Sequence, residues 1–248
     1  MPTLVLPLLN VLAVTPRSRL LTLDLGGQPF DFRPGQAVLI GAPGVPHRPY
    51  SIACSPELAS ETGTLELLIA LEDDGTLGAH LPDLRPGSPI EVEGPLGTFL
   101  FPVDPPEQRL LFVAGGTGIA PLRAMIDHLL RQPPSPRLRR PSSGRAFSLL
   151  YSARNDHEFA FIEELRGHEE RGRLEIHQTV TRDGSEKWVG WRGRIGRSHF
   201  ERVVHEPANT LCFVCGPRAM VNESVLTLRE LEVPAGAIRT EAWVVPQG

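Results

Sequence analysis

Residues 110–121 read LLFVAGGTGIAP, an apolar run followed by a glycine turn and then by Pro121. The apolar run has the length of a buried strand. Pro121 is expected to be the first residue of a helix, where its missing N–H is not needed. The helix then continues with apolar residues at the spacing of one helical face, namely Leu122, Met125, Ile126, Leu129 and Leu130. The stretch therefore predicts a strand, a tight turn and a helix in direct succession.

The glycines of this turn have two interpretations. They let the backbone approach a phosphate group, to which the following helix N-terminus offers free N–H groups. The alternative is a turn whose glycines only allow the helix to pack on the sheet. The third glycine of the usual dinucleotide fingerprint is missing after Gly118, which argues against an ordinary Rossmann dehydrogenase.

The rest of the C-terminal half has the same alternating rhythm. Asn155 with Glu158 is a candidate helix-capping pair, and Ser198 with Glu201 is another. Pro217 is expected to open a further helix. Between these helices lie apolar runs of strand length: Phe147–Ser152, Leu174–Val180, Leu211–Cys215 and Ala237–Trp243. Strands that alternate with helices predict a doubly wound α/β domain with a parallel sheet, which we place at residues 107–248.

The N-terminal half has a different pattern. Turn signals such as Gly26-Gly27 and Asp73-Asp74-Gly75 separate short apolar runs, with no helix expected between them: Leu20–Leu25, Ala37–Ile40, Tyr50–Ala53, Leu65–Leu71 and Ile90–Val92. This spacing predicts a small antiparallel β-barrel over residues 1–103. The apolar start, Pro2–Val14, is interpreted as its first strand and not as a signal peptide, because it has no basic region and no small-residue cleavage site.

Composition excludes several classes of protein. The 248 residues carry a formal net charge of −4, which argues against a general binder of nucleic acids or anionic membranes. Three cysteines are too few for a Cys₄ iron–sulfur cluster or a Cys₄ zinc site, and no metal site is expected. No apolar stretch is long enough to span a membrane. We therefore expect a cytoplasmic protein.

The stretch HRPYS at residues 47–51 is a second candidate for chemistry. In an extended strand, Arg48 and Tyr50 point to one face and Ser51 to the other. An arginine can bind a pyrophosphate through two N–H groups, and a tyrosine ring can stack on a planar ligand. The alternative is a barrel strand with an exposed arginine.

Five short motifs occur in one order along nearly the whole chain: RPYS (48–51), GPLGTF (94–99), GGTGIAP (115–121), YSAR (151–154) and CGP (215–217). With them, the chain resembles the ferredoxin–NADP⁺ reductase superfamily in its short form without an iron–sulfur domain. The resemblance implies an N-terminal barrel that binds FAD and a C-terminal α/β domain that binds NAD(P)H. It also implies an oxidoreductase in which hydride passes from nicotinamide to flavin and electrons pass onward to an acceptor.

The resemblance implies roles for residues of the barrel. Arg48 would meet the FAD pyrophosphate, Tyr50 would stack on the isoalloxazine, and Ser51 would lie near flavin N5. A second phosphate-binding turn would include Gly75, Leu77 and Gly78. The family usually has Ser or Thr where this chain has Gly78. The side-chain hydroxyl contact to the phosphate is therefore lost, and only the backbone of Gly78 is left to bind it.

In the α/β domain, Gly116, Thr117 and Gly118 would hold the pyrophosphate of the nucleotide. The motif of Cys215, Gly216 and Pro217 would bind beside the nicotinamide. Together with Ser51, Cys215 and Glu241 would line the transfer site. Cys212 and Cys215 are offset by three positions on a strand, so they point to opposite faces and a disulfide between them is disfavoured.

Ser152 and Arg154 follow the second strand of the predicted parallel sheet. This is where the adenosine ribose lies in doubly wound folds, and an arginine there can accommodate a 2′-phosphate. A solvated arginine ahead of a helix is the alternative, so the choice between NADH and NADPH stays open.

The electron acceptor also stays open. Because three cysteines are too few for a Cys₄ cluster, we expect any iron–sulfur relay to lie on another chain, so a redox partner such as an iron–sulfur protein or an oxygenase is expected. Two other functions remain: a non-catalytic electron-transfer subunit of a multicomponent system, and a reductase of free flavin.

Overall fold

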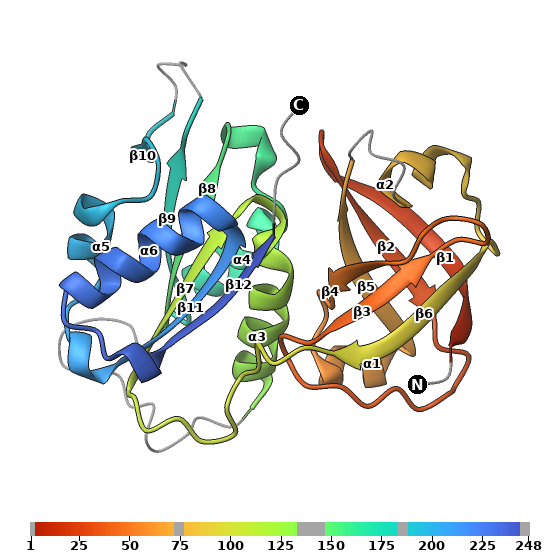
Figure 1. Cartoon of the computed structure of the whole chain (residues 1–248), viewed down its shortest axis with the longest axis horizontal. Helices are drawn as coiled ribbons and strands as arrows, with labels where there is room; N and C mark the ends of the chain where they lie inside the picture. Colours follow the sequence, from red (N-terminus) through yellow and green to blue (C-terminus); the bar gives the residue numbers. More distant parts are fainter. Residues whose placement is uncertain (1–2, 72–76, 133–146, 183–187, 244–248) are drawn as a thin grey trace. The chain divides into compact units, whose positions relative to one another are not determined.

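The structure is a computed structural model that describes residues 3–71, 77–132, 147–182 and 188–243. The chain forms two compact units (Figure 1). The first contains Met1–Phe101 together with Ala120–Arg131, and the second contains Pro102–Ile119 with Gln132–Gly248. The first unit thus includes nearly all of the helix that follows the glycine turn. Gly75 and the segment 133–146 lie outside the described residues.

The first unit is built on a six-stranded antiparallel sheet, in the order β4-β3-β6-β1-β2-β5. A bridge between Ile52 and Leu67 joins the two ends of this order, so the sheet closes on itself as the barrel expectation requires. The strands are β1 (Leu4–Thr15), β2 (Ser18–Asp24), β3 (Ala37–Gly41), β4 (Arg48–Ser51), β5 (Thr64–Ala70) and β6 (Pro89–Leu96).

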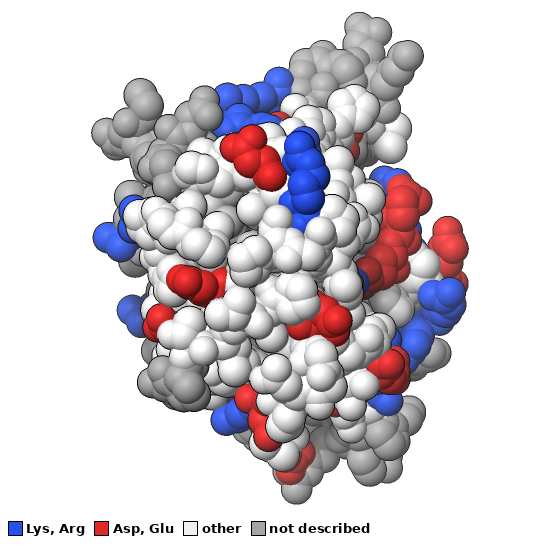
Figure 2. All heavy atoms as spheres, turned by 90° about the vertical axis from the view of Figure 1, so that its right-hand side faces the viewer, with Lys and Arg blue, Asp and Glu red and all other residues white. Residues whose placement is uncertain are grey.

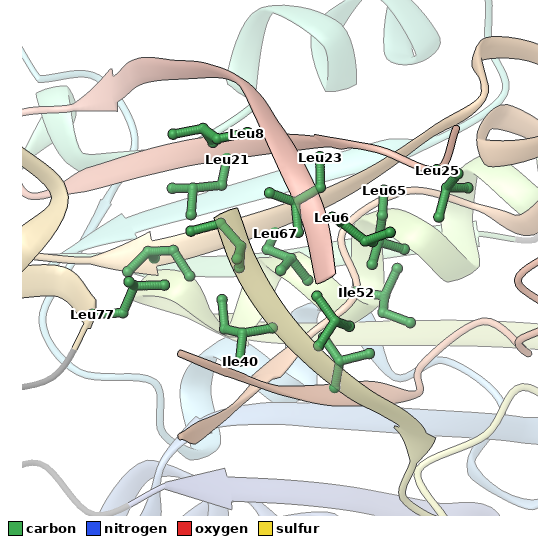
Figure 3. Packing of buried hydrophobic residues seen from close by; sticks show 14 of the residues in the cluster. Leu6, Leu8, Leu21, Leu23, Leu25, Ile40, Ile52, Leu65, Leu67 and Leu77 are labelled. Atoms are coloured by element: carbon green, nitrogen blue, oxygen red, sulfur yellow. The ribbon is translucent and has the colours of Figure 1, made fainter. Parts of the chain in front are cut away.

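Leucine and isoleucine side chains fill the barrel (Figure 3). Leu21 and Leu23 of β2 are fully buried, and so are Leu65 and Leu67 of β5, because every second residue of a strand points inward. Leu77 at the start of the short helix α2 (Leu77–His80) is also fully buried in this cluster. Helix α2 is thereby fixed to the barrel by its first residue.

The expectation of a barrel without helices is wrong at α1 (Pro56–Thr62). The Ser55 side chain accepts a hydrogen bond from the Leu58 N–H at 3.1 Å, and Pro56 occupies the first turn. Gly63 ends the helix in a left-handed conformation with φ 67°. The signals for this helix are all local: Ser-Pro at the start and Gly at the end.

Helix α3 (Ile119–Arg131) packs on the barrel through polar contacts. The Arg123 guanidinium is buried; its Nη1 donates to the Ala53 carbonyl at 2.9 Å and to Glu66 Oε2 at 2.5 Å. One turn later, Ser55 Oγ donates to the Asp127 carboxylate at 2.6 Å. The helix begins at Ile119, so the expected start at Pro121 is two residues too late; Pro121 lies within the first turn, which a proline tolerates.

The second unit has a six-stranded parallel sheet in the order β10-β9-β8-β7-β11-β12, which confirms the doubly wound prediction. The neighbouring interior strands β7 and β11 are almost completely buried. The strands are β7 (Arg109–Gly115), β8 (Phe147–Ala153), β9 (Glu175–Val180), β10 (Trp191–Arg192), β11 (Thr210–Pro217) and β12 (Ile238–Trp243). The helices of this unit are α4 (Ile162–Glu170), α5 (Arg197–Val203) and α6 (Arg218–Glu230).

Two predicted helix starts are wrong. The Asn155 side chain accepts from the His157 N–H at 3.1 Å and caps only the 3₁₀ turn η3 (Asp156–Glu158). Helix α4 starts later, at Ile162. Ser198 lies inside α5 and does not cap it. The helix follows Gly196, whose N–H donates to the His199 ring. Pro217 does directly precede α6.

Charged side chains of both signs are interspersed on the face shown in Figure 2, and the described residues form no extended basic patch there. None of the helices in the described part of the chain is both long and apolar enough to cross a membrane. The cytoplasmic location stays a prediction.

Candidate functional site

The glycine turn lies between β7 and α3 as the 3₁₀ turn η2 (Gly116–Gly118). Gly116 has φ 55°, a left-handed conformation that L side chains rarely adopt. No heavy atom lies within 4 Å of the position that a Cβ would take there, and Gly116 is exposed. The turn therefore has an open side on which a phosphate group has room to contact the backbone.

Glycines also bring the ends of β7 and β11 together. A Cβ on Gly115 would lie 2.6 Å from Met220 Sδ and 2.9 Å from Pro217 Cδ. A Cβ on Gly216 would lie 3.2 Å from the Cα of Gly115. The order of strands reverses at this pair, and ligands of open α/β sheets bind outside the carboxyl ends of such strands. The second unit thus places its glycine turn and its CGP motif at one candidate site.

Tyr151, to which the sequence assigns no role of its own, lies directly behind the glycine turn. Its hydroxyl donates to the Gly116 carbonyl at 3.1 Å and accepts from the Ala160 N–H at 3.0 Å. The side chain is fully buried, and burial raises the pKa of the phenol well above its usual range. The Phe159 ring packs edge-on against the Tyr151 ring, with 5.0 Å between centroids. A buried tyrosine needs a partner for its hydroxyl, but no local signal in the sequence names Gly116 as that partner.

Cys215 and Glu241 face each other on neighbouring strands. They are partners in the β11–β12 register, and Cys215 Sγ donates to Glu241 Oε2 at 3.7 Å. Burial, and then the nearby carboxylate, raise the pKa of the fully buried Cys215 thiol well above its usual range. The thiol is therefore protonated at neutral pH. Cys212 is also buried, and both cysteines are free in the structure.

Ser152 and Arg154 lie at the carboxyl end of β8. Ser152 is buried and Arg154 is half-buried. The Arg154 carbonyl accepts from the Arg182 N–H at 2.7 Å, which ties this end of β8 to the chain after β9. Because Ser152 is the partner of Gly115 in the β7–β8 register, this end of β8 lies next to the glycine turn.

In the first unit, the RPYS motif forms strand β4. Arg48 is exposed and has no ion-pair partner among the described residues. Tyr50 is half-buried against the barrel core, and Ser51 is half-buried. An exposed guanidinium without a carboxylate partner on the described surface fits a site for an anionic group such as a pyrophosphate.

The structure describes part of the second predicted phosphate turn. Gly78 is buried in α2, and the Leu77 side chain points into the core, so only backbone atoms of these two residues are suited to contact a ligand. Ser51 belongs to the first unit, whereas Cys215 and Glu241 belong to the second. The structure thus brings Cys215 and Glu241 together and assigns Ser51 to the barrel.

Comparison with known proteins places both units in families. A family described as "Oxidoreductase FAD-binding domain" matches residues 6–101, and one described as "Oxidoreductase NAD-binding domain" matches residues 112–225. The chain is 30% identical to an oxidoreductase NAD-binding domain-containing protein 1 from Danio rerio, over 90% of this chain and 85% of that protein. It is 34% identical to the sulfhydrogenase 1 subunit gamma of Pyrococcus furiosus, over 76% of this chain and 60% of the subunit.

Among solved structures, the chain is similar to the ferredoxin reductase in carbazole 1,9a-dioxygenase, with a TM-score of 0.81 and 26% identity. The match covers 97% of this chain and 69% of that protein. The chain thus spans 60% of the sulfhydrogenase subunit and 69% of the ferredoxin reductase chain.

Proposed function

Because this chain belongs to the ferredoxin–NADP⁺ reductase superfamily and carries its FAD-binding and NAD-binding domains, we propose that it is an NAD(P)H-dependent reductase that supplies electrons to a partner protein. When bound, the two cofactors supply the chemistry, which is hydride transfer between nicotinamide and flavin. The observation that carries the proposal is the open, left-handed glycine turn at the carboxyl end of β7.

In this proposal the barrel residues bind and orient FAD. The Arg48 guanidinium binds the pyrophosphate, and the Tyr50 ring packs on the flavin. Ser51 follows Tyr50 in β4 and contacts the flavin beside it. Backbone atoms around Gly78 contribute the second phosphate contact, together with Gly75.

The residues of the parallel sheet orient the nucleotide. Backbone N–H groups of Gly116, Thr117 and Gly118 contact its pyrophosphate. Cys215, Gly216 and Pro217 lie beside the nicotinamide, with the Cys215 proton held toward Glu241. These residues exclude water and fix orientation, and none of them needs to gain or lose a proton.

Purification of the full chain tests this function. We expect a yellow protein whose visible flavin absorbance is lost when NADH or NADPH is added without oxygen. The absorbance should return on reoxidation. A colourless protein that neither binds added FAD nor oxidises either nucleotide would contradict the proposal.

A second candidate is an electron-transfer subunit that has no substrate of its own. It is favoured by relatives named as subunits, the sulfhydrogenase 1 subunit gamma and the electron transfer subunit of a probable dihydroorotate dehydrogenase B. Such a subunit should turn over slowly with artificial acceptors and co-purify with an iron–sulfur protein or an oxygenase.

A reductase of free flavin would instead lose FAD during gel filtration and use it as a substrate.

Replacing Arg154 by alanine tests the preference between nucleotides. If its guanidinium binds a 2′-phosphate, kcat/KM for NADPH falls about tenfold and the value for NADH stays unchanged, since a charged hydrogen bond contributes ~1.5 kcal/mol. Arg182→Ala, on the neighbouring exposed segment, is the control. Equal effects of Arg154→Ala on both nucleotides would show that Arg154 does not read the 2′-phosphate.

A further inference from the structure

The Tyr151 hydroxyl connects two segments that are far apart in sequence. It donates to the carbonyl of Gly116, 35 positions away, and accepts from the Ala160 N–H after β8. Both bonds lie in the second unit; the bond from Ala160 is buried with the tyrosine ring, and the bond to Gly116 is partly buried. With one bond donated and one accepted, the hydroxyl is held in a single orientation.

The orientation of the Tyr151 hydroxyl fixes the peptide between Gly116 and Thr117, which borders the open side of the turn. The peptide is planar and trans, so its carbonyl and its N–H point in opposite directions. Because the Gly116 carbonyl points inward to Tyr151, the Thr117 N–H points away from Tyr151. The left-handed φ of Gly116 gives the turn this shape, and the space beside it is open.

We propose that Tyr151 is a positioning residue of the nucleotide site: its hydroxyl holds the peptide between Gly116 and Thr117 so that the Thr117 N–H faces the pyrophosphate of the bound nucleotide. The inference rests on the proposed function. It adds a side chain to a phosphate site that otherwise consists of backbone groups. The bond to Ala160 also ties the turn to the segment that follows Ser152 and Arg154.

The surroundings keep the hydroxyl able to donate. Burial raises the pKa of the phenol, and Glu158 opposes a negative charge there as well. Tyr151 therefore keeps its proton throughout the pH range of an assay. The Gly116 carbonyl also accepts the Ile119 N–H, so the turn keeps one restraint when the tyrosine hydroxyl is removed. The expected effect is accordingly a weakened site and not a lost one.

The test is Tyr151→Phe in the full chain. We expect KM for NADH and for NADPH to rise by the same factor, about five- to tenfold, with kcat at saturation unchanged. The inhibition constant of ADP-ribose, which contains the pyrophosphate, should rise by the same factor. This pattern differs from the one expected for Arg154→Ala, in which only kcat/KM for NADPH changes.

A matched control is Thr179→Val in the neighbouring strand β9. Thr179 is also fully buried, and its hydroxyl donates to the Gly193 carbonyl at 2.8 Å, away from the glycine turn. The Thr179→Val variant loses a buried hydroxyl and some stability, but KM for NADH and for NADPH should stay unchanged. A rise in KM no larger for Tyr151→Phe than for Thr179→Val would overturn the inference. An effect of Tyr151→Phe on kcat alone would overturn it too.

A measurement on the wild-type protein complements the variants. In amide NMR spectra, the Thr117 resonance should be among those most shifted by ADP-ribose. If the wild type binds ADP-ribose and Thr117 does not respond, the inference fails while the proposed function stands. If the wild type neither binds ADP-ribose nor oxidises NADH or NADPH, both fail.

Discussion

Arg123→Met is expected to lower the free energy of unfolding by about 3 kcal/mol. The guanidinium is buried between α3 and the barrel, where it donates to the Ala53 carbonyl and to Glu66. Methionine fills similar space but leaves the Glu66 carboxylate without its cation and the Ala53 carbonyl without this donor. Breaking one side of a largely buried ion pair costs more than the pair contributes, because the remaining Glu66 carboxylate, with a side chain 18% exposed, stays largely removed from solvent. Urea denaturation of the full chain, followed by circular dichroism, measures the loss.

Arg131→Met on the same helix is the matched control. Arg131 pairs with Asp127 and Glu61 near the surface, where solvent screens the charges, so its loss should cost less than about 1 kcal/mol. The double variant Arg123→Met/Glu66→Leu removes both charges and should recover part of the stability. If Arg123→Met were no more damaging than Arg131→Met, the buried pair would not be what fixes α3 on the barrel.

Arg48→Ala is expected to weaken FAD binding by about 10- to 100-fold. A guanidinium that binds a pyrophosphate through two charged hydrogen bonds contributes ~1.5–3 kcal/mol. Arg48 is exposed at the edge of the barrel, so its removal should change the stability of the apoprotein by less than about 0.5 kcal/mol. Titration of apoprotein with FAD, followed by flavin fluorescence, gives the dissociation constant.

Two further variants identify the source of this effect. Arg48→Lys keeps the charge but not the planar fork, so its affinity should lie between those of the wild type and Arg48→Ala. Arg85→Ala removes another exposed arginine of the same unit, which donates to the Pro82 and Leu84 carbonyls, and should leave FAD affinity unchanged. Equal FAD affinity in Arg48→Ala and wild type would remove Arg48 from the flavin site.

The elements predicted best are those whose signals are local. The strand, turn and helix around residues 110–121 were predicted because apolar runs, glycines and a proline act within a few positions. The helix α1 was missed although Ser55, Pro56 and Gly63 mark it. Asn155 was misplaced because its side chain can cap either a 3₁₀ turn or an α-helix, and the sequence does not distinguish the two.

The two-domain architecture, the position of the glycine turn and the burial of β7 and β11 follow from periodicity and backbone conformation, so they can be predicted from the sequence. The tertiary structure alone decided which side chains support the site. Tyr151 reaches Gly116 across 35 positions and Arg123 reaches Glu66 across 57. A hydrogen-bond partner at such a separation is set by how strands and helices pack, for which a single sequence contains no local signal.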